Sequence, residues 1–103
     1  MIKVYVYKNS AGVYRVEPGV AIITGGHKLR VVNASNAAVK VTLPAGASHS
    51  SDPVTKSIAS HEREDFSTRT QGTDQARAFN YDVMTSSGKF AHGNSDPVLI
   101  IEN

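Results

Sequence analysis

The fold is decided by the end of the chain, residues 76–103, which read ARAFNYDVMTSSGKFAHGNSDPVLIIEN. From Phe79 through Tyr81 to Val83, every second residue is aromatic or apolar, which is typical of a half-buried strand. The segment 98–101, VLII, is apolar on both of its faces. We therefore expect a strand, a long polar loop over 85–97, and a closing strand that is either central in a sandwich or covered by a partner.

The rest of the chain shows the same period of two. Alternating segments separated by Gly, Pro, Asn and Ser predict strands at 2–7, 13–16, 20–24, 28–33 and 38–43, the first two forming one hairpin and the next two a second. Between 54 and 69, a helix capped by Ser51-Asp52-Pro53 competes with two strands at 54–59 and 64–69, and the threonines favour strands. We expect the core to centre on Phe79, Tyr81, Val83, Val98 and Ile100.

These segments predict an all-β fold, a single Greek-key β-sandwich of about seven to nine strands. The chain has 103 residues, so 1–103 is expected to form one domain with one core. A hydrophobic fraction of 40% and a charged fraction of 19% are ordinary for a folded domain. The formal charge of +2 gives no strong reason to expect nucleic acid or acidic lipid as a partner.

Cysteine is absent from the sequence, which excludes disulfides, thiolate nucleophiles and thiolate metal ligands. No apolar run approaches the roughly 20 residues that a membrane-spanning helix needs. The first five residues, MIKVY, do not have the basic start and apolar middle of a signal peptide. We therefore expect no membrane association and, by default, a cytoplasmic location, although a mature exported domain behind a new Met would have the same sequence features.

Three pieces of the sequence carry a resemblance to a known family. They are Val16-Glu17-Pro18-Gly19 leading into a strand, the segment 29–33 before a pairing strand, and Phe79-Asn80-Tyr81-Asp82-Val83 feeding a loop and the terminal strand 98–102. In this order the chain resembles the cupredoxin-like family, and an immunoglobulin-like sandwich is the alternative. The resemblance implies a Greek-key sandwich with a functional loop between its last two strands.

The sequence departs from the copper-carrying members of that family. There, the loop between the last two strands supplies Cys, His and usually Met as copper ligands, and another His comes from an earlier strand or loop. In this chain the loop 85–97 contains only His92. A blue-copper centre depends on a Cys sulfur with two imidazoles. The resemblance therefore implies a member lacking the copper ligands and without electron-transfer activity, and we expect no cofactor.

Four histidines remain as possible metal ligands: His27, His49, His61 and His92. His49 precedes Ser-Ser-Asp52-Pro-Val, and His92 precedes Gly-Asn-Ser-Asp96-Pro-Val, so the chain nearly repeats itself. If the two loops met, His49, His92, Asp52 and Asp96 could hold Cu(II) or Zn(II), and His61 is a further candidate ligand. The simpler interpretation is that Asp before Pro opens a strand or helix and that the histidines are exposed in loops.

Other chemistry has weaker support. The sequence contains no G-x-S-x-G elbow and no phosphate loop, so we expect no enzyme. The charged run 61–65 mixes signs and is typical of a solvated turn. Basic side chains with tyrosines between them could gather on one sheet face and hold single-stranded nucleic acid, although strand-edge lysines also discourage aggregation. These residues are Lys3, Lys8, Arg15, Lys28, Arg30 and Lys40, with Tyr5, Tyr7 and Tyr14.

The leading hypothesis is a non-catalytic protein-interaction or assembly module. Its positive support is the two-sided apolar strand at 98–101 and the tyrosine-bearing first strand at 2–7, either of which could contact a partner or a second copy. The alternatives are a metal-binding protein that uses His and carboxylate ligands and a weak nucleic-acid-binding module.

Overall fold

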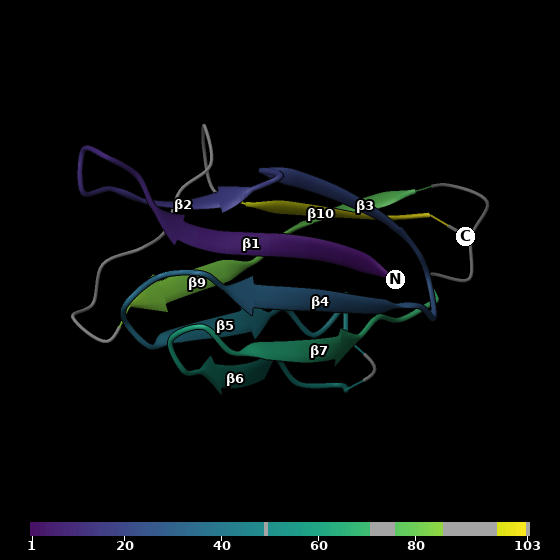
Figure 1. Cartoon of the computed structure of the whole chain (residues 1–103). Coiled ribbons are helices and arrows are strands. Elements are labelled where there is room, and N and C mark those ends of the chain that lie inside the picture. Colours follow the sequence, from purple (N-terminus) through teal and green to yellow (C-terminus); the bar gives the residue numbers. More distant parts are fainter. Residues whose placement is uncertain (49, 71–75, 86–96, 103) are drawn as a thin grey trace.

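A computed structural model describes residues 1–48, 50–70, 76–85 and 97–102 (Figure 1). None of these residues is helical, and ten strands account for the regular structure. In chain order the strands are β1 (Ile2–Lys8), β2 (Tyr14–Glu17), β3 (Val20–Thr24), β4 (Lys28–Asn33), β5 (Val39–Leu43), β6 (Val54–Ile58), β7 (Arg63–Ser67), β8 (Arg77–Asn80), β9 (Asp82–Thr85) and β10 (Val98–Glu102).

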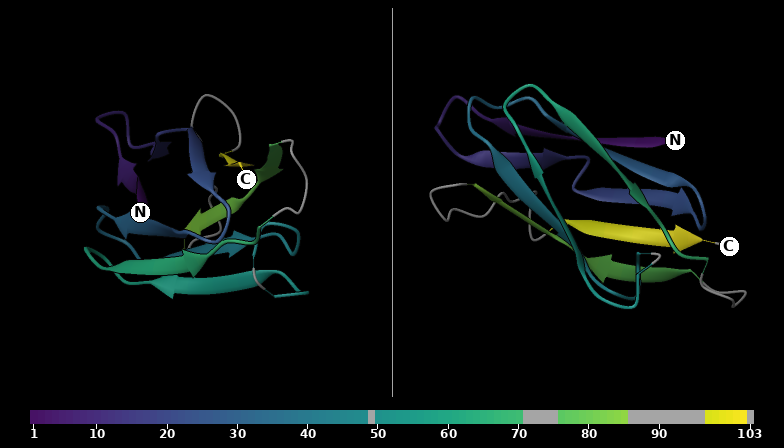
Figure 2. Two further views of the ribbon diagram at one scale, coloured as in Figure 1. Left: turned by 90° about the vertical axis from the view of Figure 1, so that its right-hand side faces the viewer. Right: turned by 90° about the horizontal axis from the view of Figure 1, so that it is seen from below.

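The strands form two layers around one interior (Figure 2). One layer is a four-stranded sheet in the order β2-β1-β4-β7. The other consists of two three-stranded sheets, β3-β10-β8 and β6-β5-β9. Because β8 runs directly into β9, these two sheets share one continuous segment of chain. The expectation of an all-β sandwich is confirmed.

The first expected hairpin is present. β1 and β2 pair antiparallel, with Val6 opposite Val16. The turn is held by the side-chain oxygen of Asn9, which accepts hydrogen bonds from the amides of Ala11 and Val13 at 3.0 and 2.9 Å. Gly12 completes the turn at φ +80°, a conformation that favours glycine.

The second expected hairpin is wrong. β3 pairs in parallel with β10, whereas β4 pairs with β1 and β7, so the two segments belong to different layers. Gly25 and Gly26 lead the chain from one layer to the other. A Cβ at Gly25 would lie 2.9 Å from the Cα of Thr70, so this crossing requires glycine. The two glycines identified a turn in the sequence, but they did not show that the chain passes to the other layer there.

The segment 54–69 forms the two expected strands, and the helical alternative is wrong. β6 and β7 do not pair with each other, because β6 pairs with β5 and β7 pairs with β4. Lys56 links them across the two layers. Its ammonium group donates a hydrogen bond of 2.6 Å to the backbone carbonyl of Asp65 and lies 5.2 Å from the centre of the Phe66 ring.

The strand expected around Phe79, Tyr81 and Val83 is divided into β8 and β9, and Tyr81 lies between them. β8 pairs with β10 and β9 pairs with β5. At the division, the Tyr81 amide donates to the carbonyl of Pro97 at 3.1 Å. This division helps to explain why the structure has ten strands where seven to nine were expected.

The core is one cluster of buried apolar side chains contributed by both layers. Tyr81 and Val83 belong to it as expected, and Phe79 packs against it half-buried. Val98 and Ile100 were wrongly placed at its centre. In β10 the inward residues are Leu99 and Ile101, both fully buried. A strand that is apolar on both faces gives no signal for which alternate set points inward.

Candidate interaction surfaces

The first candidate surface is the outer face of the sheet β3-β10-β8. In the parallel register, Val20 neighbours Val98 and Ile22 neighbours Ile100, and Ala78 of β8 lies beside Ile100. Val20 is 51% exposed and Ile22 52% exposed, while Val98 and Ile100 are half-buried. We call this set the aliphatic face: Val20, Ile22, Ala78, Val98 and Ile100.

The aliphatic face is unusual for parallel strands. Two parallel neighbours that are apolar on both sides are normally covered on both sides, because their outward residues are as apolar as their inward ones. Here Ala21, Ile23, Leu99 and Ile101 point into the core, and the alternate residues point outward. In the described part of the chain no third layer covers them. The expectation that β10 is either central or covered by a partner is therefore met by its central position in the sheet β3-β10-β8.

The second candidate surface is the outer face of the four-stranded sheet β2-β1-β4-β7, which we call the charged face. The structure brings Lys3, Lys28 and Arg30 to this face, with Tyr5 and Tyr7 beside them, as the sequence suggested, and Arg15 pairs with Tyr7 across the strands. Two of the expected basic residues lie elsewhere. The Lys8 ammonium is 5.7 Å from the ring of Tyr14 at the end of the hairpin, and Lys40 is on β5 in the other layer.

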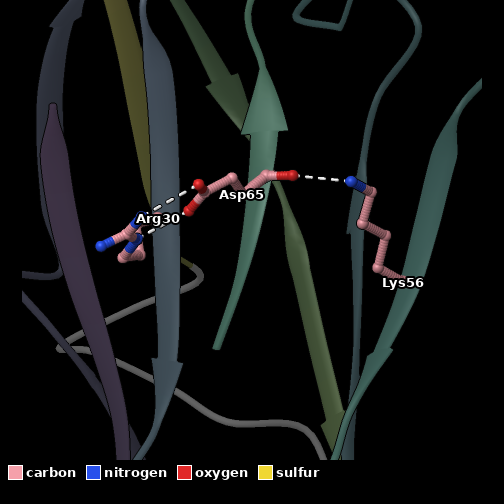
Figure 3. Close-up of polar contacts among 3 residues, drawn as sticks. All are labelled: Arg30, Lys56 and Asp65. Carbon is pink, nitrogen blue, oxygen red and sulfur yellow. Dashed lines mark hydrogen bonds and ion pairs between the residues drawn. The ribbon is translucent and has the colours of Figure 1, made fainter. Parts of the chain in front are cut away.

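An ion pair orders the middle of this second face. The Nε of Arg30 donates to Asp65 Oδ1 at 2.7 Å, and its Nη2 donates to Oδ2 at 3.1 Å, a bidentate arrangement (Figure 3). The hydrogen bonds from Arg30 lower the pKa of the Asp65 carboxyl, and the charges of Arg30, Lys28 and Arg63 lower it further. The run 61–65 is therefore not only a solvated turn, since Asp65 lies within β7 and is committed to Arg30.

Beside this ion pair lies an open pocket of about 370 Å³, which we call the charged pocket. It is lined by Lys3, Tyr5, Arg30, Val32, His61, Glu62 and Arg63. Val32 lies between Tyr5 and Arg63 in the strand register, so a short apolar side chain is flanked by two long ones. His61 forms part of the pocket from the turn after β6, where its φ is +64°.

The metal-site residues proposed from the sequence are not brought together where the structure describes them. Asp52 precedes β6 and His61 follows it, so a strand of five residues, about 17 Å long, separates them. His49, His92 and Asp96 lie outside the described residues. Within the described ranges, no three His, Cys, Asp or Glu side chains form a group that could hold a metal ion. The metal site stays a prediction.

Two buried polar side chains, Thr85 and Asn33, lie at the ends of β9 and β4. β9 ends at Thr85, which is buried and pairs with Val39 at the start of β5. The loop that follows is described only at Pro97. Nearby, buried Asn33 ties two turns together: its Nδ2 donates to the carbonyls of Ala37 at 2.7 Å and Ile58 at 3.0 Å.

One buried titratable group lies in the core between these surfaces. The Tyr81 side chain is almost completely buried, and its hydroxyl has no hydrogen-bond partner among the described residues. Burial raises the pKa of this phenol well above its usual value, because the phenolate would lose its hydration. Tyr81 is therefore a neutral core side chain.

Comparison with known proteins supports the fold alone. No protein-family model and no protein with a curated description matches the sequence significantly. Among solved structures, a Cu(I) form of a methionine-to-alanine mutant of amicyanin aligns with 97% of this chain and 82% of its own, at TM-score 0.59 and 12% identity. A purple cupredoxin from Nitrosopumilus maritimus aligns over 99% of this chain and 100% of its own, at TM-score 0.58 and 10% identity. The chain has the cupredoxin-like fold.

A third similar structure, a reduced Cu(I) form of a proline-to-glycine mutant of amicyanin at pH 4, gives TM-score 0.58 and 14% identity over 97% of this chain and 82% of its own. At these identities the cupredoxin-like fold is shared, but copper binding is not transferred to this sequence. The comparison also decides between the two sandwich types considered, in favour of the cupredoxin-like one. None of the described residues forms a helix long and apolar enough to cross a membrane.

The sequence missed the aliphatic face because it assigned β3 to the wrong neighbour. A usable signal was present: the segment 20–23, VAII, is apolar on both faces, as is 98–101, VLII. Continuous apolar runs of this kind are typical of parallel neighbours. Pairing the two runs would have placed Val20 and Ile22 beside Val98 and Ile100.

Proposed function

We propose that this protein is a non-catalytic assembly module on a cupredoxin-like sandwich and that a second copy of the chain binds to its aliphatic face. The observation that carries the proposal is that Val20 and Ile22 are half exposed directly beside Val98 and Ile100. Branched aliphatic side chains on a central strand and its parallel neighbour form a flat apolar surface, which is characteristic of an interface.

A second copy suits this surface for two reasons. An isologous contact places the same patch on itself, and a purely aliphatic patch is complementary to itself because it has no donor or acceptor to match. The charged residue in register at its end is Glu102, next to Thr24. A two-fold axis through the middle of the patch, with the β10 strands antiparallel, would place the two Glu102 side chains at opposite ends, where their repulsion is small.

The size of the patch indicates a reversible dimer. A stable interface buries about 800 Å² on each partner. Five aliphatic side chains, of which two are half-buried, provide less than this. The contact must therefore extend to the polar residues around the patch, and association in the micromolar range or weaker is expected.

The non-catalytic part of the proposal is supported by the environment of the two histidines that the structure describes. Neither the His27 nor the His61 imidazole has a hydrogen-bond partner among the described residues. A catalytic imidazole is normally oriented by a carboxylate or carbonyl and lies within reach of the group that it deprotonates.

Sedimentation velocity over a wide concentration range tests the proposal. The wild-type protein should shift from monomer to dimer with concentration, and Ile22→Lys should weaken the dimer by at least about tenfold, since it places a charge in the apolar contact. Val13→Lys is the matched control, because Val13 is 43% exposed but lies in the turn between β1 and β2. A strict monomer at every concentration, or equal weakening by both substitutions, would contradict the proposal.

A further inference from the structure

We propose that the charged pocket binds a phosphate group, held by Lys3, Arg30 and Arg63. This site is on the four-stranded sheet and shares no residue with the aliphatic face. It is therefore independent of the assembly function, and each can fail without the other.

The strand register places three cations around one point. Lys3 on β1 is directly beside Arg30 on β4, and one row further along Val32 lies between Tyr5 and Arg63. Val32 forms the floor, because it is shorter than its neighbours in the row. The three basic residues lie on three different strands. The pairing of these strands fixes the relative positions of their Cα atoms.

The cations at this point are only partly neutralised by ion pairs within the described chain. Like charges directly opposite each other in a sheet are destabilising, and Lys3 and Arg30 form such a pair. Asp65 compensates Arg30 from the other side. The side chains of Lys3 and Arg63 form no hydrogen bond or ion pair with any residue of the described chain, although the charge of Arg63 lowers the pKa of Asp65. A bound oxyanion would relieve the repulsion that the register imposes.

Arg30 is already oriented for such a ligand. Asp65 holds Nε and Nη2 of the guanidinium, so the plane of the group is fixed before anything binds. Figure 3 shows a further nitrogen of Arg30 pointing away from Asp65, toward β1, which carries Lys3. A planar guanidinium with free N–H groups is well suited to phosphate oxygens, and a fixed one loses little conformational freedom on binding.

The surroundings favour a compact phosphate group over a nucleic-acid strand. Glu62 lines the pocket, and Glu17 lies opposite Tyr5 on β2. A long polyanion crossing this face would come close to both carboxylates, whereas a single phosphate can stay among the three cations. Tyr5, which is 44% exposed, offers a ring against which the organic part of a phosphate ester could pack.

Calorimetric titration with inorganic phosphate, at an ionic strength held constant with chloride, tests the site. Saturable binding is expected, and Lys3→Gln and Arg63→Gln should each weaken it about tenfold, the effect expected from one charge-assisted hydrogen bond. Lys40→Gln makes the same change of charge on the other layer and should have no effect. Unfolding midpoints of the three variants show whether each is folded.

A second titration with phenyl phosphate separates the two possible sources of the phosphate group. Equal affinity for both probes would indicate free phosphate, while tighter binding of phenyl phosphate that is lost in Tyr5→Ala would indicate an ester. Either result supports the pocket. The proposal is overturned if phosphate binds no better than chloride, or if Lys40→Gln weakens binding as much as Lys3→Gln. It is also overturned if oligothymidylate binds more tightly than phenyl phosphate, with a steep salt dependence.

Discussion

The two outer faces of this sandwich differ in chemistry although they cover the same core. On the four-stranded sheet, the outward residues of the central strands include Lys3, Tyr5, Lys28 and Arg30, with Tyr7 and Val32 beside them. On the sheet β3-β10-β8, the corresponding residues are the branched aliphatic side chains of the aliphatic face. The inward residues of both sheets are similar, mainly Val, Leu and Ile. The inward residues of the strands therefore account for the fold. The outward residues of the strands carry the two binding surfaces that we propose.

The largest expected effect is the difference in free energy of unfolding between substitutions on the two sides of β10. Leu99 is fully buried, so Leu99→Ala should lower the free energy of unfolding by about 3 kcal/mol through lost apolar burial and a cavity. Ile100→Ala, on the outer side of the same strand, should cost less than about 1 kcal/mol in the monomer, because Ile100 is only half-buried. Urea denaturation at a concentration where the protein is monomeric measures both.

The reverse order of these two values would mean that β10 has the opposite orientation. The aliphatic face would then consist of Leu99 and its neighbours, and the distinction between the two outer faces would have to be redrawn. Val83→Ala, at a buried position on β9, is a suitable second reference and should be destabilising like Leu99→Ala.

The same strand shows how far the sequence could predict the fold. The alternation of β1, β4 and β5 identified both the strands and their inward faces, because polar residues alternate with apolar ones there. In 98–101 every residue is apolar, so the sequence located a strand but could not decide which side faces the core. The sequence also did not show which strands pair. β3 and β10 are separated by most of the chain, and the turn residues after β3 led to the wrong partner for it.

The candidate sites were predictable to a smaller extent. The sequence indicated that Lys3, Arg30 and Tyr5 could share a face, since all three occupy outward positions on expected strands. It did not indicate that β1 and β4 are parallel neighbours, which places Lys3 beside Arg30. Nor could it bring Arg63 and His61 to the same pocket, because that depends on the pairing of β4 with β7. Geometry of this kind is set by long-range pairing.

A substitution in the shared interior tests whether the two faces are independent of each other. The buried Tyr81 hydroxyl has no partner in the described chain, so its desolvation is not offset by a hydrogen bond. We expect Tyr81→Phe to raise the free energy of unfolding by about 1 kcal/mol, measured by urea denaturation. Dimerisation and phosphate binding should stay unchanged.

Tyr14→Phe is the control, since Tyr14 is half-buried at the edge of the core and its ring contact with Lys8 does not depend on the hydroxyl. It should change stability very little. A loss of about 1 kcal/mol or more in Tyr81→Phe would show that the hydroxyl has a hydrogen-bond partner in solution.

A smaller gain in the free energy of unfolding is expected from a substitution of His61, at the edge of the charged face. His61 has φ +64° in the turn closed by the hydrogen bond from the Glu62 amide to the Ala59 carbonyl, a conformation that favours glycine. His61→Gly should therefore stabilise the fold by about 0.5 kcal/mol, with the relief of strain partly offset by a more flexible unfolded chain. Thermal unfolding compares it with Ala59→Gly, which should be destabilising because it gains only flexibility.

The smallest effect concerns the ion pair that orders the charged face. The pKa of Asp65 is lowered in the fold by Arg30, so its contribution to stability is present above the ordinary carboxyl pKa of about 4 and is lost as the pH falls through the folded value. The difference in urea midpoint between wild type and Asp65→Asn should thus be greatest near pH 7 and shrink below about pH 4. Both side chains are partly exposed, at 21% for Arg30 and 30% for Asp65, so added salt should reduce the difference further.

Asp82→Asn is the control, because Asp82 is exposed on β9 and has no ion pair within the described ranges. It removes a carboxylate without breaking an ion pair of the described residues and should leave the midpoint close to that of the wild type. If Asp65→Asn did the same, Arg30 would not be held by Asp65 in solution. The guanidinium would then be free to turn, and the charged face would lose the one fixed donor that sets it apart from an ordinary basic surface. The contrast with the aliphatic face would then be one of chemistry alone.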